Sequence, residues 1–167
     1  MTNAVRRLLT ITSFTIALFT SGPSQAQVAV QADSSQEQLL ASPDARLAAN
    51  KRLVYDFWRE VLEAGHMELA EKYMTESYIQ HNPNVPTGRA AFVEVFSKLG
   101  KPKPIEPMVQ APLVAIVAEG NLVVLSFVSK HKDPKDATKT YTTTWFDMFR
   151  VEGGKIAEHW DPDTKEE

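Results

Sequence analysis

TWFDMFRVEGGKIAEHWD (residues 144–161) decides the fold, because it contains two strand-like runs joined by a pair of glycines. Side chains alternate between the two faces of a strand, so Asp147 shares a face with Phe149, and His159 shares a face with Asp161. Ionisable side chains are costly to bury unless they have partners. Three of them among large apolar residues indicate a lined cavity rather than plain core packing.

The loop of this hairpin determines which of these side chains oppose each other, because a shift of one residue reverses the faces. A three-residue loop over 152–154, with glycine in the left-handed position, sets Asp147 opposite His159. A two-residue Gly-Gly loop instead sets Asp147 opposite Trp160. We expect the three-residue loop because it gathers the polar groups on one face. The alternative is an edge hairpin with solvated charges.

The first 26 residues are typical of a secretory signal peptide rather than of a folded element. Arg6 and Arg7 precede an apolar run at 8–20, and small residues follow at 24–26, before an expected cleavage site. The run is too short for a good membrane span. We therefore expect residues 1–26 to be removed and the protein to be periplasmic or secreted.

The composition of the chain limits the classes of protein to which it can belong. Of 167 residues none is cysteine, so the domain depends on its apolar core and not on disulfides. The net charge is −3 and no block of Lys or Arg occurs, so nucleic-acid binding is not expected. Residues 27–43 are polar and are predicted to form a flexible leader to a single domain at 44–167.

The order of the predicted elements indicates an α+β fold. Apolar residues recur at helical spacing from a cap at Asp44 or Ser42 to Ala64, a short helix follows at 67–73, and a third starts at Thr87 or Gly88. The period then changes to two, with strands predicted at 105–117, 121–132, 140–151 and 155–161. Helices followed by an antiparallel meander predict helices packed on a curved β-sheet, a cone with a pocket at one end.

Residues 50–161 resemble the SnoaL-like branch of the nuclear transport factor 2-like superfamily. The resemblance is carried by the order of the segments and above all by YIQHNP (78–83) combined with EHWD (158–161). It implies the same cone fold with a small-molecule pocket. Members of the superfamily include polyketide cyclases that perform an aldol condensation, ketosteroid isomerases, dehydratases and epoxide hydrolases, so the resemblance does not give the substrate.

The residues of the hairpin suit cofactor-free acid–base chemistry on a small, mostly apolar carbonyl compound. A carboxylate among apolar groups tends to have a raised pKa, which fits Asp147 as the base that removes a proton alpha to the carbonyl. His159 is its expected partner, and His81 or His131 is expected to donate to the enolate oxygen. The other expected pocket residues are Asp161, Trp145, Tyr78 and Phe149.

Metal and cofactor chemistry are weakly supported. The possible ligands His81, His131, His159 and Asp147 come from separate segments without a local metal-binding spacing, so no metal is expected. A nucleophile elbow, a phosphate loop and a dinucleotide fingerprint are all absent from the sequence, so no cofactor is expected. The alternative function is a non-catalytic periplasmic binding or interaction module.

A homodimer is also expected, because one face of the last two strands presents an apolar patch. That patch comprises Phe146, Met148, Ile156 and Trp160.

Overall fold

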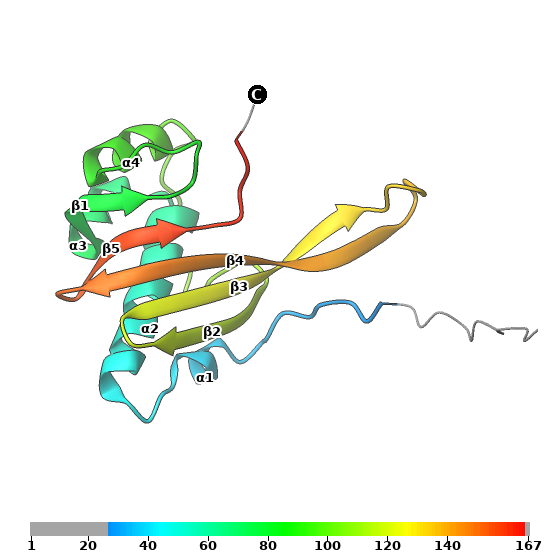
Figure 1. Cartoon of the computed structure of the whole chain (residues 1–167), viewed down its shortest axis with the longest axis horizontal. Coiled ribbons are helices and arrows are strands. Elements are labelled where there is room, and N and C mark those ends of the chain that lie inside the picture. Colours follow the sequence, from blue (N-terminus) through cyan, green and yellow to red (C-terminus); the bar gives the residue numbers. More distant parts are fainter. Residues whose placement is uncertain (1–26, 166–167) are drawn as a thin grey trace, which may run out of the picture.

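The computed structural model describes residues 27–165, and these form helices packed against one curved five-stranded sheet (Figure 1). The helical elements are α1 (Gln36–Leu40), α2 (Ala45–Phe57), the π-helix η1 (Trp58–Glu63), the 3₁₀-helix η2 (Met67–Leu69), α3 (Ala70–Tyr73) and α4 (Arg89–Phe96). The strands are β1 (Met74–Gln80), β2 (Leu113–Glu119), β3 (Leu122–Lys132), β4 (Thr140–Glu152) and β5 (Lys155–Trp160). The predicted α+β class and cone architecture are confirmed.

The long first helix begins where the sequence predicts. The side chain of Asp44 accepts hydrogen bonds from the backbone N–H groups of Arg46 and Leu47, which caps the start of α2. After Phe57 the helix widens into η1, and Gly65, at φ +76°, ends it. The π-helix, which the sequence analysis did not predict, turns Trp58 onto Phe127, with ring centroids 4.4 Å apart.

The sheet has the order β1-β5-β4-β3-β2. Strands β2 to β5 form the predicted antiparallel meander, although β2 starts only at Leu113 because the proline-rich segment before it is irregular. Strand β1 was not predicted, and it lies parallel to β5 at the edge, with Gln80 beside His159. It brings residues 74–80 into the same wall as the end of β5.

The expected three-residue loop of the last hairpin is wrong. Glu152 pairs with Lys155, so the loop has two residues, and both glycines have positive φ, +54° and +75°, as a type I′ turn requires. One extra residue then bulges from β5 at Ala157, and beyond it Phe149 pairs with His159. The shorter loop alone would turn His159 to the face opposite Asp147, and the bulge returns His159 to the same face as Asp147.

Aromatic side chains fill the space between α2, α4 and the sheet. Phe57 lies about 6.0 Å, between ring centroids, from each of Tyr73, Phe92 and Phe149. Phe92 also contacts Tyr78 edge-on. Buried aromatic pairs in such geometries stabilise a core beyond the area they bury. This cluster forms the floor of the cone.

The packed domain begins before residue 44, inside the segment expected to be a leader. Helix α1 lies within that segment, and Leu40 is buried in the core. The buried side chain of Gln36 accepts a hydrogen bond from the Tyr55 hydroxyl at 2.6 Å and donates to the Val109 carbonyl at 2.9 Å. The polar composition of residues 27–43 concealed this role. Gln36 makes the hydrogen bonds that water would otherwise make with the buried Tyr55 hydroxyl and the buried Val109 carbonyl.

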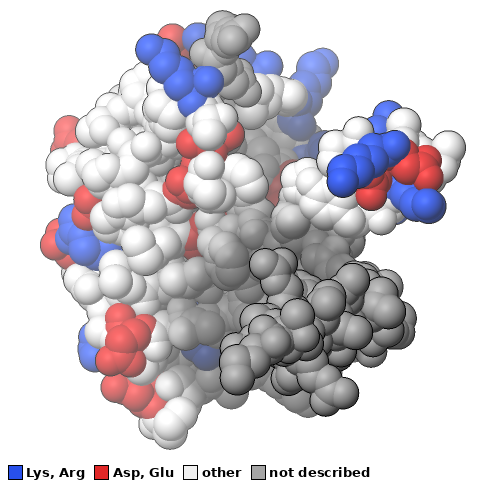
Figure 2. All heavy atoms as spheres, turned by 45° about the vertical axis from the view of Figure 1, so that its right-hand side comes forward, with Lys and Arg blue, Asp and Glu red and all other residues white. Residues whose placement is uncertain are grey.

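Strands β3 and β4 continue past their neighbours as a two-stranded arm, residues 128–144 (Figure 1). Lys and Asp side chains gather on its projecting tip (Figure 2), where Lys139 pairs with Asp136 at 3.0 Å. The chain near Val30 runs beside the arm, with its backbone N–H donating to the Thr142 hydroxyl. None of the helices within residues 27–165 has the length and apolar character needed to cross a membrane.

Candidate functional site

A cavity of about 290 Å³ lies between the aromatic floor and the end of the sheet. Most of its wall is apolar, and its polar groups come from β1, β4, β5 and the segments that follow β1 and β5. The lining residues are Phe57, Trp58, Leu62, Tyr78, Gln80, Asn82, Val85, Phe92, Phe96, Leu99, Asp147, Phe149, His159 and Asp161. A larger hollow of about 590 Å³ near Arg59 and Glu106 contains no buried ionisable group, so we take the smaller one as the site.

Asp147 projects from β4 into this cavity and is almost fully buried, at 4% exposure. Its Oδ1 lies 3.0 Å from Nε2 of His159, whereas its Oδ2 is buried without a hydrogen-bond partner among the described residues. Burial raises the pKa of the Asp147 carboxyl above its usual value, and the bond to His159 opposes this only in part. The unpaired oxygen is therefore an unsatisfied hydrogen-bond acceptor in a mostly apolar cavity.

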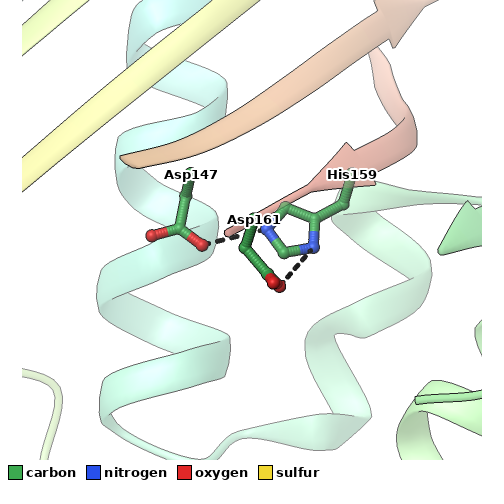
Figure 3. Close-up of side chains that lie close together, drawn as sticks. All are labelled: Asp147, His159 and Asp161. Carbon is green, nitrogen blue, oxygen red and sulfur yellow. Dashed lines mark hydrogen bonds and ion pairs between the residues drawn. The ribbon is translucent and has the colours of Figure 1, made fainter. Parts of the chain in front are cut away.

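His159 lies between two carboxylates, each on a different ring nitrogen (Figure 3). Nε2 faces Asp147, and Nδ1 lies 3.7 Å from Oδ2 of Asp161 and 3.0 Å from Oε1 of Gln80. The ring stacks on Phe149 with centroids 4.6 Å apart, which fixes its plane. The three ionisable residues that the hairpin sequence singled out are thus brought together, although Asp147 meets His159 diagonally and not as its opposite neighbour.

Asp161 follows β5 and is held by groups from the segment after β1. The Asn82 amide donates to both of its carboxylate oxygens, at 3.1 and 2.9 Å, and the backbone N–H of Asp163 donates to Oδ1. Asp161 lines the cavity as expected. Its hydrogen bonds to Asn82 fix its position beside His159.

Tyr78 supplies a hydroxyl group from β1. Its ring is buried, at 1% exposure, and its oxygen accepts a hydrogen bond from Nε2 of Gln80 at 3.1 Å. Burial raises the pKa of Tyr78 well above its ordinary value, and the nearby Asp161 and Asp147 add to the shift. The hydroxyl therefore stays protonated at neutral pH, and its hydrogen finds no acceptor among residues 27–165.

His81 does not face Asp147 across the cavity, contrary to expectation. It follows Gln80 directly, so the alternation along β1 sends its ring to the opposite face of the sheet. There its Nε2 lies 2.7 Å from Oε1 of Glu158, and its ring stacks on Trp160 at 4.9 Å. Its side chain is 43% exposed, so it is unsuited to donate a proton inside the pocket.

His131 and Trp145 also lie outside the cavity lining. His131 is on the exposed arm, where its Nε2 contacts the hydroxyls of Ser129 and Thr143. Trp145 packs against the core, and the interaction of its side chain, a hydrogen-bond donor, with the Asp147 carboxyl slightly opposes the rise in the pKa of Asp147. Phe149 and Tyr78 do line the cavity as predicted.

Gln80 and Asn82 line the cavity but were not among the predicted site residues. Both lie at alternate positions after Tyr78, so the three side chains point to the same side. This period-two pattern was present in the sequence. Pro83 and Pro86 obscured it, because they suggested a turn where a short parallel strand precedes them.

The cluster of Asp147, His159 and Asp161 also bears on metal binding, since one ligand atom from each lies within 4.8 Å of the others. The two carboxylates face opposite nitrogens of one imidazole ring, and each already has a hydrogen-bond partner. A cation would have to replace one of these hydrogens. The arrangement therefore suits proton sharing better than metal binding.

The comparison with protein families gives a match to the SnoaL-like domain over residues 54–159, which covers most of the folded chain. The chain belongs to this family. The SnoaL-like match includes Tyr78, Gln80, Asp147 and His159 and stops just before Asp161.

Solved structures give similarities at low sequence identity. A candidate polyketide cyclase from Acidithiobacillus ferrooxidans is 20% identical, with a TM-score of 0.48 over 72% of this chain and 89% of that one. An LEH-like epoxide hydrolase of M. tuberculosis is 12% identical, with a TM-score of 0.46 over 68% and 80%. A protein with a cystatin-like fold from Xanthomonas campestris is 16% identical, with a TM-score of 0.46 over 68% and 91%. The comparison with curated proteins found no match.

Proposed function

We propose that this SnoaL-like domain is a cofactor-free acid–base enzyme that removes a proton alpha to the carbonyl of a small, uncharged compound. The observation that carries the proposal is the buried Oδ2 of Asp147, an acceptor without a partner in a mostly apolar cavity. An unsatisfied buried carboxylate oxygen costs free energy in the empty protein. A substrate C–H group held against it would use that oxygen as a base.

Tyr78 takes the role of hydrogen-bond donor that the sequence analysis gave to His81 or His131. Its hydroxyl is protonated and has a free hydrogen, so it can donate to the carbonyl oxygen of a bound substrate. A donor fixed before the reaction stabilises the negative charge that develops on that oxygen. The site then holds a base and a charge-stabilising donor in one wall.

The proposed reaction begins with a proton transfer from the substrate to Asp147. The C–H proton moves to Oδ2 of Asp147, and the electron pair of that bond delocalises onto the carbonyl oxygen, where Tyr78 donates its hydrogen bond. The enolate carbon then attacks a second carbonyl, or is reprotonated at another position, or expels a β-hydroxyl group. Asp147 returns its proton to the resulting oxygen, carbon or leaving group, so aldol condensation, isomerisation and dehydration share the first step.

The cavity favours a neutral substrate. Lys and Arg are absent from its described lining, whereas Asp147 and Asp161 both reach it. A substrate carboxylate would meet like charge in a low-dielectric environment. Aromatic and aliphatic side chains cover the rest of the wall, which fits a compound that is mainly apolar beyond its carbonyl.

Deuterium exchange into trial ketones tests the proposal. Asp147→Asn removes the base but keeps the shape of the side chain, and we expect the exchange rate to fall by about 10²–10⁴-fold. Asp136→Asn, on the exposed arm, is the matched control and should leave the rate unchanged. Unchanged exchange in Asp147→Asn would sink the assignment. Saturable ketone binding without exchange in the wild type would instead indicate the non-catalytic binding module.

Two further expectations belong to this proposal. Export rests on the signal-like residues 1–26, which lie outside the described residues, and detection of a shortened chain in the periplasm or medium would test it. Homodimer formation rests on the outer face of the sheet, where Phe146 is 52% exposed beside Met148 and Trp160. Ile156, expected in that patch, is fully buried on the inner side. Sedimentation would give the oligomeric state.

A further inference from the structure

Gln80 has a fixed amide orientation, because two neighbours distinguish its oxygen from its nitrogen. The backbone N–H of Asn82 donates to Oε1 at 3.0 Å, and Nε2 donates to the Tyr78 hydroxyl at 3.1 Å. Exchange of the two amide atoms would bring an N–H donor against the N–H of Asn82. The carbonyl oxygen of Gln80 is therefore the atom that meets His159.

This oxygen determines where a hydrogen lies on the imidazole ring. Nδ1 of His159 is 3.0 Å from Oε1 of Gln80 and 3.7 Å from Oδ2 of Asp161, and both of these atoms are acceptors. A bare Nδ1 would place a lone pair against lone pairs at hydrogen-bond distance. Only a hydrogen on Nδ1 satisfies the contact.

The second ring nitrogen then shares a hydrogen with the proposed base. Nε2 lies 3.0 Å from Oδ1 of Asp147 in a buried contact, so one hydrogen occupies that bond. A carboxylate beside a neutral imidazole would hold one hydrogen, on Nε2. With Nδ1 also protonated, Asp147 and His159 hold two hydrogens between them. Asp147 and His159 together are then uncharged overall, which suits their apolar surroundings.

We propose that Gln80 is a positioning residue that holds His159 as its Nδ1–H form, so that the ring keeps a hydrogen on both nitrogens when Asp147 accepts the substrate proton. The positive imidazolium would then face the new enolate, whose charge it partly balances. This inference rests on the proposed function for its consequence in catalysis. The hydrogen on Nδ1 follows from the contacts alone.

The experiment separates these two parts. Nitrogen-15 NMR of the ring nitrogens in the whole protein, with His159 assigned by the loss of its signals in His159→Gln, reports which nitrogen carries hydrogen. Wild type should show a hydrogen-bearing Nδ1 without any substrate. Gln80→Glu keeps an acceptor oxygen and should preserve that form, whereas Gln80→Met has a similar length without an acceptor and should shift the ring toward Nε2–H.

Exchange kinetics on the same variants give the functional readout. Gln80→Met should lower kcat for ketone deuterium exchange by about tenfold or more, with a smaller change in KM, and Gln80→Glu should recover most of the loss. Gln38→Met, on the exposed face of α1, is the matched control. A bare Nδ1 in wild type, or an unchanged ring in Gln80→Met, would overturn the inference. A hydrogen-bearing Nδ1 together with no ketone exchange would overturn the proposed function and leave the role of Gln80 in place.

Discussion

Asp147→Asn should make the protein more stable at neutral pH while it removes the proposed base. The wild-type carboxylate is buried, its Oδ2 has no partner, and burial raises its pKa. An unsatisfied buried acceptor costs about 1–3 kcal/mol and more when it is charged, and asparagine keeps the acceptor but removes the charge. Its amide can also donate to Nε2 of His159 in place of the shared hydrogen. We therefore expect a gain of about 1–2 kcal/mol in the free energy of unfolding at pH 7.

The stability difference between Asp147→Asn and wild type should depend on pH. Because the folded pKa of Asp147 lies above the unfolded value, the folded state binds this proton more tightly than the unfolded state. The stability from the protonated form is fully present below about pH 3.9 and is lost as the pH rises through the folded pKa. The advantage of Asp147→Asn should thus grow with pH, by about 1.4 kcal/mol for each unit of pKa elevation, and then level off.

Urea unfolding of both proteins from about pH 3.5 to 7.5 measures this difference. Asp136→Asn is the control of opposite sign, because the hydrogen bond from Thr138 lowers the pKa of Asp136. That carboxylate stabilises the fold above its unfolded pKa, so its variant should lose stability as the pH rises. An Asp147→Asn protein that is less stable than wild type by the same amount at every pH would refute the reasoning, since the bond to His159 would then outweigh burial.

Two further predictions concern the scaffold of the site. Gly154→Ala should lower the free energy of unfolding in urea by about 1 kcal/mol, because φ is +75° at this residue. A Cβ at Gly154 would meet nothing within 4 Å, so backbone strain is the whole effect. An unchanged free energy of unfolding would mean that the turn has relaxed. Glu63→Ala should cost about 2–4 kcal/mol, because its carboxylate accepts hydrogen bonds from the Trp58 indole and from the backbone N–H groups of Gln110 and Ala111. Thermal melts of Glu63→Ala beside the exposed Glu94→Ala control would test it, and equal melting temperatures would contradict this role.

The sequence predicted the elements whose signals are local. The cap at Asp44, the break at Gly65 and the period-two strands β3 to β5 all depend on neighbours a few residues away. The shared face of Asp147 and His159 was predicted from a loop that proved wrong. It holds because a two-residue loop with one bulge shifts β5 to the same face as the expected three-residue loop.

The unpredicted features depend on partners distant in the chain. Met74–Gln80 has a mixed apolar and polar pattern and becomes a strand only because the edge of β5 is open to it. The bulge at Ala157 has no signature of its own and follows from how β5 packs against β4. His81 was assigned to the pocket because its segment was treated as a turn, and the strand reverses its direction.

Because of the bulge at Ala157, the face that β5 turns to the cavity depends on whether the number of one-residue shifts in the hairpin is even or odd. Turn length and bulge each shift β5 by one residue, and only their sum decides whether the odd-numbered or the even-numbered residues of β5 reach the cavity. Loss of either shift alone would present Glu158 and Trp160 inward and turn His159 outward, whereas two compensating changes would restore the site. Single-residue insertions and deletions in this hairpin therefore act as all-or-none changes, while point substitutions there are graded. Relatives whose hairpins differ by one residue should either carry a matching bulge or have lost the Asp–His pair.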